Sequence, residues 1–189
     1  MVEVRSLTLH GLGQLEDGTL VERVLPGEDI ELVDGAPRIL TPSADRVAAP
    51  CRHFKTCGGC RMQHASDAFV AEWKTGIVQK AMQARGLPFP FRVLHTSPAQ
   101  SRRRARFGVR KTKSGALIGF HGRASHTVVD APDCQLVLPS LRAVRPALEA
   151  LSRVASTRKS EVPITVTDSL NGVDVLVETD KPLDESLRI

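Results

Sequence analysis

The first part of the chain carries short runs in which apolar and polar residues alternate. Three of these runs have the period of a half-buried strand: residues 2–9, 19–25 and 29–33. Turn-forming residues separate them, namely Gly11, Gly13 and the pair Pro26-Gly27. Residues 37–50 contain proline and alanine without any periodicity, which predicts a linker. The pattern therefore predicts a small β unit over residues 1–47.

A helical pattern begins after this unit. Apolar residues recur at intervals of three and four positions between Phe69 and Met82. Ser66 is a good N-cap residue, and Gly86 is a typical helix terminator. The pattern therefore predicts a helix over residues 67–85.

Strand patterns return in the middle of the chain. Three runs predict strands: residues 91–94, 104–111 and 116–121. The sequence Lys113-Ser114-Gly115 is suited to a hairpin turn between the second and the third. In the second strand Arg104 and Arg106 alternate with Ala105 and Phe107, and the alternation breaks near Gly108. One face of this strand should therefore be basic and the other apolar.

The last part of the chain combines a helical and a hairpin pattern. Apolar residues at helical intervals from Leu138 to Val154 predict a helix with Ser140 as its cap. Residues 163–167 and 173–178 predict a β-hairpin, and residues 180–189 predict a terminal helix or tail. Together the patterns predict an α+β fold with a β-rich central domain.

Charge is distributed unevenly along the chain, whose formal net charge is +5. Residues 1–50 carry 4 basic and 9 acidic side chains, whereas residues 51–135 carry 15 basic and 4 acidic ones. Residues 136–189 are close to neutral, with 7 basic and 8 acidic side chains. The middle of the chain is therefore the part suited to a polyanionic partner.

The four cysteines have the spacing of a metal site. Cys51, Cys57 and Cys60 lie within ten residues, in the pattern C-x5-C-x2-C, and Cys134 follows far downstream. Gly58-Gly59 allows a tight turn that presents two thiols to one side. Iron–sulfur clusters are held by four thiolates, and one known arrangement takes three from a loop and the fourth from a distant segment.

Three other readings of the cysteines stay open. A structural zinc site usually pairs two CxxC-like motifs, and Cys134 has no CxxC partner. Disulfides fit poorly, because the first residues lack the regions of a signal peptide. Four unrelated buried cysteines also fit poorly, because three of them lie in a polar, glycine-rich loop.

Five stretches resemble the bacterial RNA uracil-C5 methyltransferases: Pro50-Cys51, the segment Cys57 to His64, Arg104 to Arg110, Gly119-Phe120-His121, and Asp130 to Cys134. The resemblance implies a [4Fe-4S] cluster held by Cys51, Cys57, Cys60 and Cys134. It also implies an RNA substrate, either ribosomal or transfer RNA, and S-adenosylmethionine as the methyl donor. Family members continue into a Rossmann-like catalytic domain, which we expect to be absent from this chain.

Seven basic residues are predicted to bind RNA, because arginine and lysine side chains suit a phosphate backbone. They are Arg102, Arg103, Arg104, Arg106, Arg110, Lys111 and Arg123. Lone histidines such as His64, His121 and His126 are more often structural than metal-ligating, and none is assigned to a metal.

We predict four parts: a truncated RNA-binding-type β-barrel (1–47), a cluster loop (48–65), a helix that packs on the missing catalytic domain (66–88) and the central β-rich domain (89–189). No catalytic or S-adenosylmethionine-binding residue is expected, because the cluster uses every cysteine and no Gly-rich cofactor turn is present. We therefore expect a cytoplasmic monomer that cannot methylate RNA alone. The alternatives are a nucleic-acid-binding module with a structural zinc and an iron–sulfur electron-transfer protein.

Overall fold

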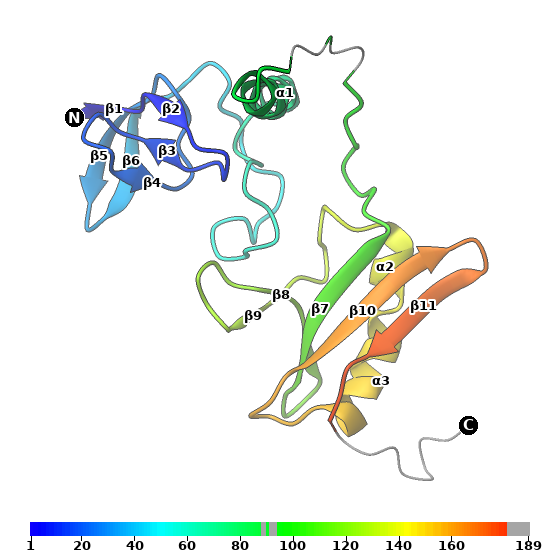
Figure 1. Ribbon diagram of the computed structural model, residues 1–189. Helices are drawn as coiled ribbons and strands as arrows, with labels where there is room; N and C mark the ends of the chain where they lie inside the picture. Colours follow the sequence, from blue (N-terminus) through cyan, green and yellow to red (C-terminus); the bar gives the residue numbers. More distant parts are fainter. Residues whose placement is uncertain (88–89, 91–93, 181–189) are drawn as a thin grey trace. The chain divides into compact units, whose positions relative to one another are not determined.

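The computed structural model describes residues 1–87, 90 and 94–180 (Figure 1). The strand predicted at residues 91–94 and the terminal element predicted at 180–189 therefore lie almost entirely outside the described residues. The described chain forms two compact units. The N-terminal unit comprises Met1–Pro50 and the described part of Arg61–Thr96, and the central unit comprises Cys51–Cys60 and the described residues from Ser97 onward.

The N-terminal unit contains two antiparallel sheets of three short strands each. The first has the order β1 (Val2–Glu3), β5 (Asp29–Val33) and β6 (Ala36–Thr41), and the second has the order β2 (Ser6–Leu7), β3 (Gly13–Gln14) and β4 (Leu20–Val21). Their buried side chains form one small core of Val4, Leu15, Val21, Val24 and Ile30. A closed barrel stays a prediction, because the strands pair in two separate sheets.

Two predictions for this unit were wrong in detail. The single strand predicted at residues 2–9 is two strands, because the chain passes from one sheet to the other: the Val4 amide still bonds Glu28 beside β5, whereas the Arg5 amide bonds Gln14 of β3. The predicted linker begins with a real strand, β6, which starts before Pro37. Proline is tolerated there because β6 lies at the edge of its sheet, where a missing N–H breaks no ladder bond.

Helix α1 (Asp67–Gln83) confirms the helical pattern of this part of the chain. The hydroxyl of Ser66 accepts a hydrogen bond from the Phe69 amide at 3.2 Å, as an N-cap residue should. The helix ends at Gln83, shortly before Gly86, whose φ is +64°. None of the residues of α1 is fully buried.

The central unit is a five-stranded antiparallel sheet with two helices on one face (Figure 1). The strand order is β11 (Gly172–Val177), β10 (Val162–Ser169), β7 (Arg104–Lys111), β8 (Ala116–His121) and β9 (Val128–Asp130). Strands β7 and β8 have the bounds that the sequence pattern predicts, and β10 and β11 form the predicted hairpin. The core between sheet and helices includes Phe107, Val109, Ile118, Leu141, Leu148 and Ile164.

The helix predicted from Leu138 is instead two helices, α2 (Pro139–Ala143) and α3 (Arg145–Ala155). Pro146 explains the break, because proline cannot donate within a helix and is best placed in its first turn, where α3 begins. The predicted cap, Ser140, lies inside α2, and its hydroxyl is 2.6 Å from the carboxylate of Asp168. Among the described residues, no helix is long and apolar enough to cross a membrane.

Candidate functional site

The cysteine loop, residues 51–60, is fixed to the end of β8 within the central unit. Cys57 forms an isolated antiparallel bridge with Gly122, and the Gly58 amide donates to the carbonyl of His121 at 2.9 Å. A Cβ atom at Gly58 would lie 2.9 Å from that same carbonyl oxygen. A glycine is therefore needed for the close approach of the loop to β8.

Arg123, which directly follows Gly122, also holds the loop. Its guanidinium donates to the backbone carbonyls of Cys60 at 2.7 Å and Phe54 at 3.3 Å. The guanidinium carbon also lies 5.2 Å from the centre of the Phe54 ring, in cation–π geometry. Arg123 thus positions the loop that carries three of the cysteines. The RNA-binding role predicted for Arg123 stays a prediction.

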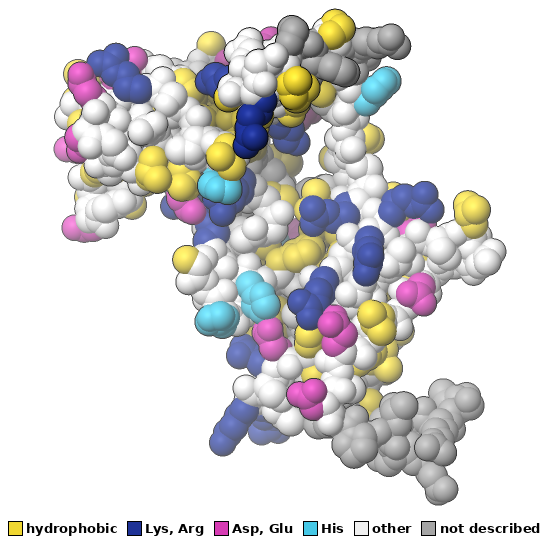
Figure 2. Space-filling view, in the orientation of Figure 1, with side chains coloured by type: hydrophobic (Ala, Val, Ile, Leu, Met, Phe, Trp, Pro, Cys, Tyr) yellow, Lys and Arg dark blue, Asp and Glu magenta, His cyan; other side chains and the backbone are white. Residues whose placement is uncertain are grey.

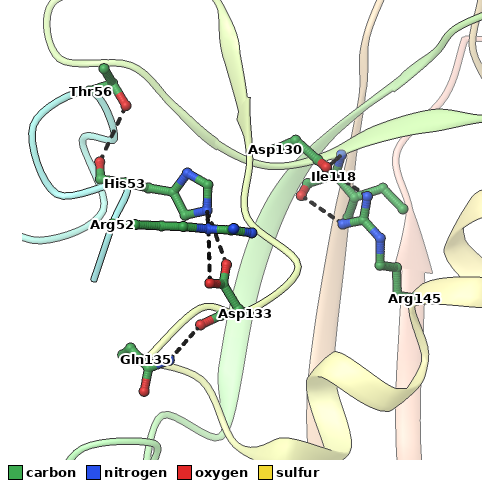
Figure 3. A network of polar contacts seen from close by, with 8 residues as sticks. All are labelled: Arg52, His53, Thr56, Ile118, Asp130, Asp133, Gln135 and Arg145. Carbon is green, nitrogen blue, oxygen red and sulfur yellow. Dashed lines mark hydrogen bonds and ion pairs between the residues drawn. The ribbon is translucent and has the colours of Figure 1, made fainter. Parts of the chain in front are cut away.

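A second link joins the loop to the residue before Cys134. Figure 3 shows Arg52 and His53 of the loop pointing toward Asp133, with which each makes a contact of 3.0 Å. Burial alone would raise the pKa of the Asp133 carboxyl, but the hydrogen bond with His53 and the charge of Arg52 outweigh it and hold that pKa below its usual value. Sequence reasoning missed His53 and Asp133, whose proximity to Cys51 and Cys134 was the available signal.

These links bring cysteines from the two segments into one neighbourhood. None of the four forms a disulfide; Cys57 and Cys134 are buried, while Cys51 and Cys60 are half-buried. Burial raises the pKa of the Cys57 thiol, and the nearby Cys134 and Cys51 thiols raise it further. Three of the predicted ligands are therefore close enough to interact electrostatically.

The thiols do not form a preassembled metal cage. Within the described part of the chain, no group of three or more histidine, cysteine, aspartate or glutamate side chains has the arrangement to hold a metal ion. The donor groups are nevertheless of the right type, because an iron–sulfur centre is bound by cysteine thiolates and this site brings together cysteines of two linked segments. A metal at this site remains a proposal.

The basic face predicted for β7 exists in the structure. Arg104 and Arg106 are exposed, while Ala105 and Phe107 are buried against the helices. Across the sheet, Arg104 is paired in register with Thr167 of β10, and Arg106 with Thr165. Figure 2 shows lysine and arginine side chains gathered over β7 and β10. We call Arg104 and Arg106 the arginine face of β7. Its charge is of the sign that suits a phosphate backbone.

The other predicted RNA-binding residues lie in varied surroundings. Arg102 and Arg103 are exposed just before β7, and Arg103 lies 3.8 Å from the carboxylate of Asp168. Arg110 is half-buried in β7. Lys111 extends its amino group to the backbone carbonyl of Arg153 at the end of α3, at 3.3 Å. The structure therefore gathers some of the predicted residues on one face and gives Lys111 a contact with the helix.

Comparisons with known proteins identify relatives of this chain. No family model matches it. An uncharacterized RNA methyltransferase of Brucella suis biovar 1 is 31% identical over 182 residues, which is 92% of this chain and 44% of that protein. The 23S rRNA (uracil(1939)-C(5))-methyltransferase RlmD of Halomonas elongata is 34% identical over 79% of this chain and 34% of its own length.

The protein of the same name from Aromatoleum aromaticum is 35% identical over 78% of this chain and 38% of its own length. The chain thus spans less than half the length of each of these relatives. Its homologues are named RNA methyltransferases, among them enzymes that modify a uracil of 23S rRNA.

Proposed function

We propose that this chain is the RNA-recognising, iron–sulfur-bearing part of an S-adenosylmethionine-dependent RNA uracil-C5 methyltransferase that acts on ribosomal or transfer RNA. The observation that carries the proposal is the arginine face of β7, which lies in the same unit as the four cysteines. The printed names of the relatives, which include 23S rRNA methyltransferases, supply the reaction class.

The residues proposed to hold a [4Fe-4S] cluster are Cys51, Cys57, Cys60 and Cys134. When bound, the cluster would supply a covalent link between the cysteine loop and the segment that follows β9. The protein's own residues already begin this link through Arg123 and through the contact of His53 with Asp133. The role proposed for the centre is therefore architectural: it would hold the loop firmly against the sheet that carries the arginine face.

Methyl transfer itself is proposed to need residues outside these 189. In the proposed reaction a cysteine thiolate adds to C6 of the uracil, which makes C5 nucleophilic toward the methyl group. Every cysteine of this chain is assigned to the cluster, so none remains for that addition. The proposed setting is a cytoplasmic monomer whose catalytic domain is supplied by the longer protein.

The cluster proposal predicts a brown protein after anaerobic purification, with about four iron atoms per chain and broad visible absorbance. Cys134→Ser should lower the iron content to near zero, because it removes the ligand from the distant segment. Thr56→Ser is the matched control in the loop, since its hydroxyl can still bond the His53 carbonyl, and it should keep the iron. A colourless protein with one zinc atom would instead favour the nucleic-acid-binding module with a structural metal.

RNA binding is predicted to weaken steeply with salt, because phosphate contacts release counterions. The slope of log K against log salt is negative, and the double variant Arg104→Gln/Arg106→Gln should make it shallower by about 1 to 2. Arg153→Gln removes an exposed arginine from α3, on the other side of the sheet, and should leave the slope unchanged. Fluorescence anisotropy with a labelled RNA at several salt concentrations measures both. Equal slopes for the double variant and the wild type would contradict the role of this face.

A further inference from the structure

A small pocket opens in the central unit where β7 and β8 diverge. Their pairing runs from Lys111–Ala116 to Gly108–Gly119 and stops there, whereas β7 continues beside β10. The pocket that lies at this point has a volume of about 140 Å³. It is lined by Arg106, Phe107, Gly108, Phe120, His121, Glu161 and Pro163. The pocket therefore adjoins the arginine face of β7.

The floor of the pocket is apolar. The Phe120 ring, which is half-buried, packs against the buried Phe107 ring with 5.2 Å between ring centres. Pro163 of β10 lies directly opposite Gly108 of β7. A Cβ atom at Gly108 would lie 2.8 Å from Val128 Cγ2 and 3.6 Å from both Glu161 Oε2 and His121 Nε2. Because position 108 has no side chain, Val128, His121 and Glu161 can pack close to the backbone of β7 beside the pocket.

The walls of the pocket carry charge in a defined arrangement. His121 Nε2 lies 2.6 Å from Glu161 Oε1, which fixes the carboxylate beside the apolar floor. At the rim, the guanidinium of Arg106 donates to both carboxylate oxygens of Glu178, at 2.9 and 3.2 Å, and remains 61% exposed. The pocket thus combines an apolar floor, a hydrogen-bond-accepting carboxylate and an accessible arginine.

This combination suits one unstacked nucleobase. Proteins that read single-stranded RNA stack splayed bases on aromatic side chains and bond their polar edges. A carboxylate accepts a hydrogen bond from the amino group of a base, and arginine binds the adjacent phosphate. Pockets for drug-sized ligands measure roughly 300–1,000 Å³, so a pocket of about 140 Å³ is suited to a single ring system rather than to a larger molecule.

We propose that this pocket binds one unpaired adenine or cytosine of the RNA, with its ring against Phe120 and Pro163 and its exocyclic amino group donating to Glu161. The proposal rests on the proposed RNA-binding function. It adds a preference for one base of the RNA other than the methylated uracil. Uracil is disfavoured because it presents the O4 carbonyl oxygen where cytosine presents its amino group, and that oxygen would face the Glu161 carboxylate.

Short RNA oligonucleotides test this preference directly. The probes are labelled hexauridine and the same hexamer with one internal adenosine or cytidine, titrated by fluorescence anisotropy at one fixed salt concentration. We expect an adenosine or cytidine to tighten binding by about 5- to 10-fold, the lower part of the range for a good base contact. Glu161→Gln should remove or reverse the preference, because its amide can also donate to a uracil carbonyl. Glu161→Ala should remove it.

Glu178→Gln is the matched control, because it makes the same change in charge beside Arg106 without altering the lining of the pocket. This variant should keep the preference of the wild type. If the wild type binds all hexamers equally at this salt concentration, and a second titration series shows that binding weakens steeply as salt is added, the pocket proposal is overturned while the proposed function stands. If it binds neither the hexamers nor a longer structured RNA at low salt, both are overturned.

Discussion

Replacing Arg46 by methionine is expected to destabilise the N-terminal unit by about 3–5 kcal/mol, the usual cost of leaving one member of a buried ion pair uncompensated. Glu28 is fully buried, and its carboxylate accepts hydrogen bonds from Arg46, from the Leu25 amide at 2.8 Å and from the Ser43 amide at 3.2 Å. Arg46 is its charged partner, and Arg46 also donates to the carbonyl of Arg23.

The loss should depend on pH in a defined direction. Burial alone would raise the pKa of Glu28, but the hydrogen bonds from Arg46, Leu25 and Ser43 outweigh it and hold that pKa below its usual value of 4.5. In the wild type this interaction stabilises the fold above pH 4.5 and is lost as the pH falls through the lowered pKa. Arg46 is the largest of the influences that lower the pKa of Glu28, so its loss should let burial raise that pKa, and protonation should then relieve the buried charge. The destabilisation of Arg46→Met should therefore be largest at neutral pH and shrink toward pH 4.5.

Urea unfolding followed by the fluorescence of Trp73 measures this effect, because Trp73 is the single tryptophan of the chain and lies near Gly11 in the same unit. Arg38→Met is the matched control. The Arg38 side chain is 71% exposed and lies 3.7 Å from Glu31, so its loss should cost less than about 1 kcal/mol. A cost for Arg46→Met as small as that of the control, or one that does not change with pH, would show that the buried pair does not stabilise this unit.

Local sequence patterns predicted the elements whose signal lies within a few neighbouring residues. The alternation of arginine with Ala105 and Phe107 predicted β7, because a strand at the surface of a domain needs one apolar and one polar face. Ser66 predicted the start of α1, because its hydroxyl satisfies an amide of the helix's first turn. The single helix predicted from Leu138 was wrong in its continuity, since Pro146 lies in the first turn of a second helix, α3.

Such patterns predicted less of the candidate site. The cysteine spacing indicated which thiols should gather, but the links that bring them together are tertiary. Arg123 was predicted to bind RNA because of its charge alone. Its contacts with the carbonyls of Phe54 and Cys60 have no signature in the neighbouring sequence. Glu28 carries no sequence signal either, because a buried glutamate differs from an exposed one only in its distant partner, Arg46. Contacts between residues far apart in sequence explain both omissions.

The second large effect is expected at Gly119 in β8, where alanine should destabilise the central unit by about 3 kcal/mol or more. A Cβ atom at this position would lie 1.9 Å from the carbonyl oxygen of Val129 and 3.1 Å from its carbonyl carbon. Both are backbone atoms of β9, which cannot rotate away as a side chain can. Strands β8 and β9 would have to separate, and the segment leading to Cys134 would lose its support.

Gly115→Ala is the matched control in the hairpin between β7 and β8. A Cβ atom there would meet the carboxylate oxygen of Glu149, at 2.5 Å, which is the end of a flexible side chain, so the cost should stay below about 1 kcal/mol. Amide hydrogen exchange distinguishes the two variants. Gly119→Ala should speed the exchange of the Ala131 amide, which bonds the Ile118 carbonyl, and of the Gly122 amide, which bonds the Thr127 carbonyl. Unchanged exchange at both amides would mean that β9 accommodates a methyl group, and that the position of Cys134 does not depend on the close contact at Gly119.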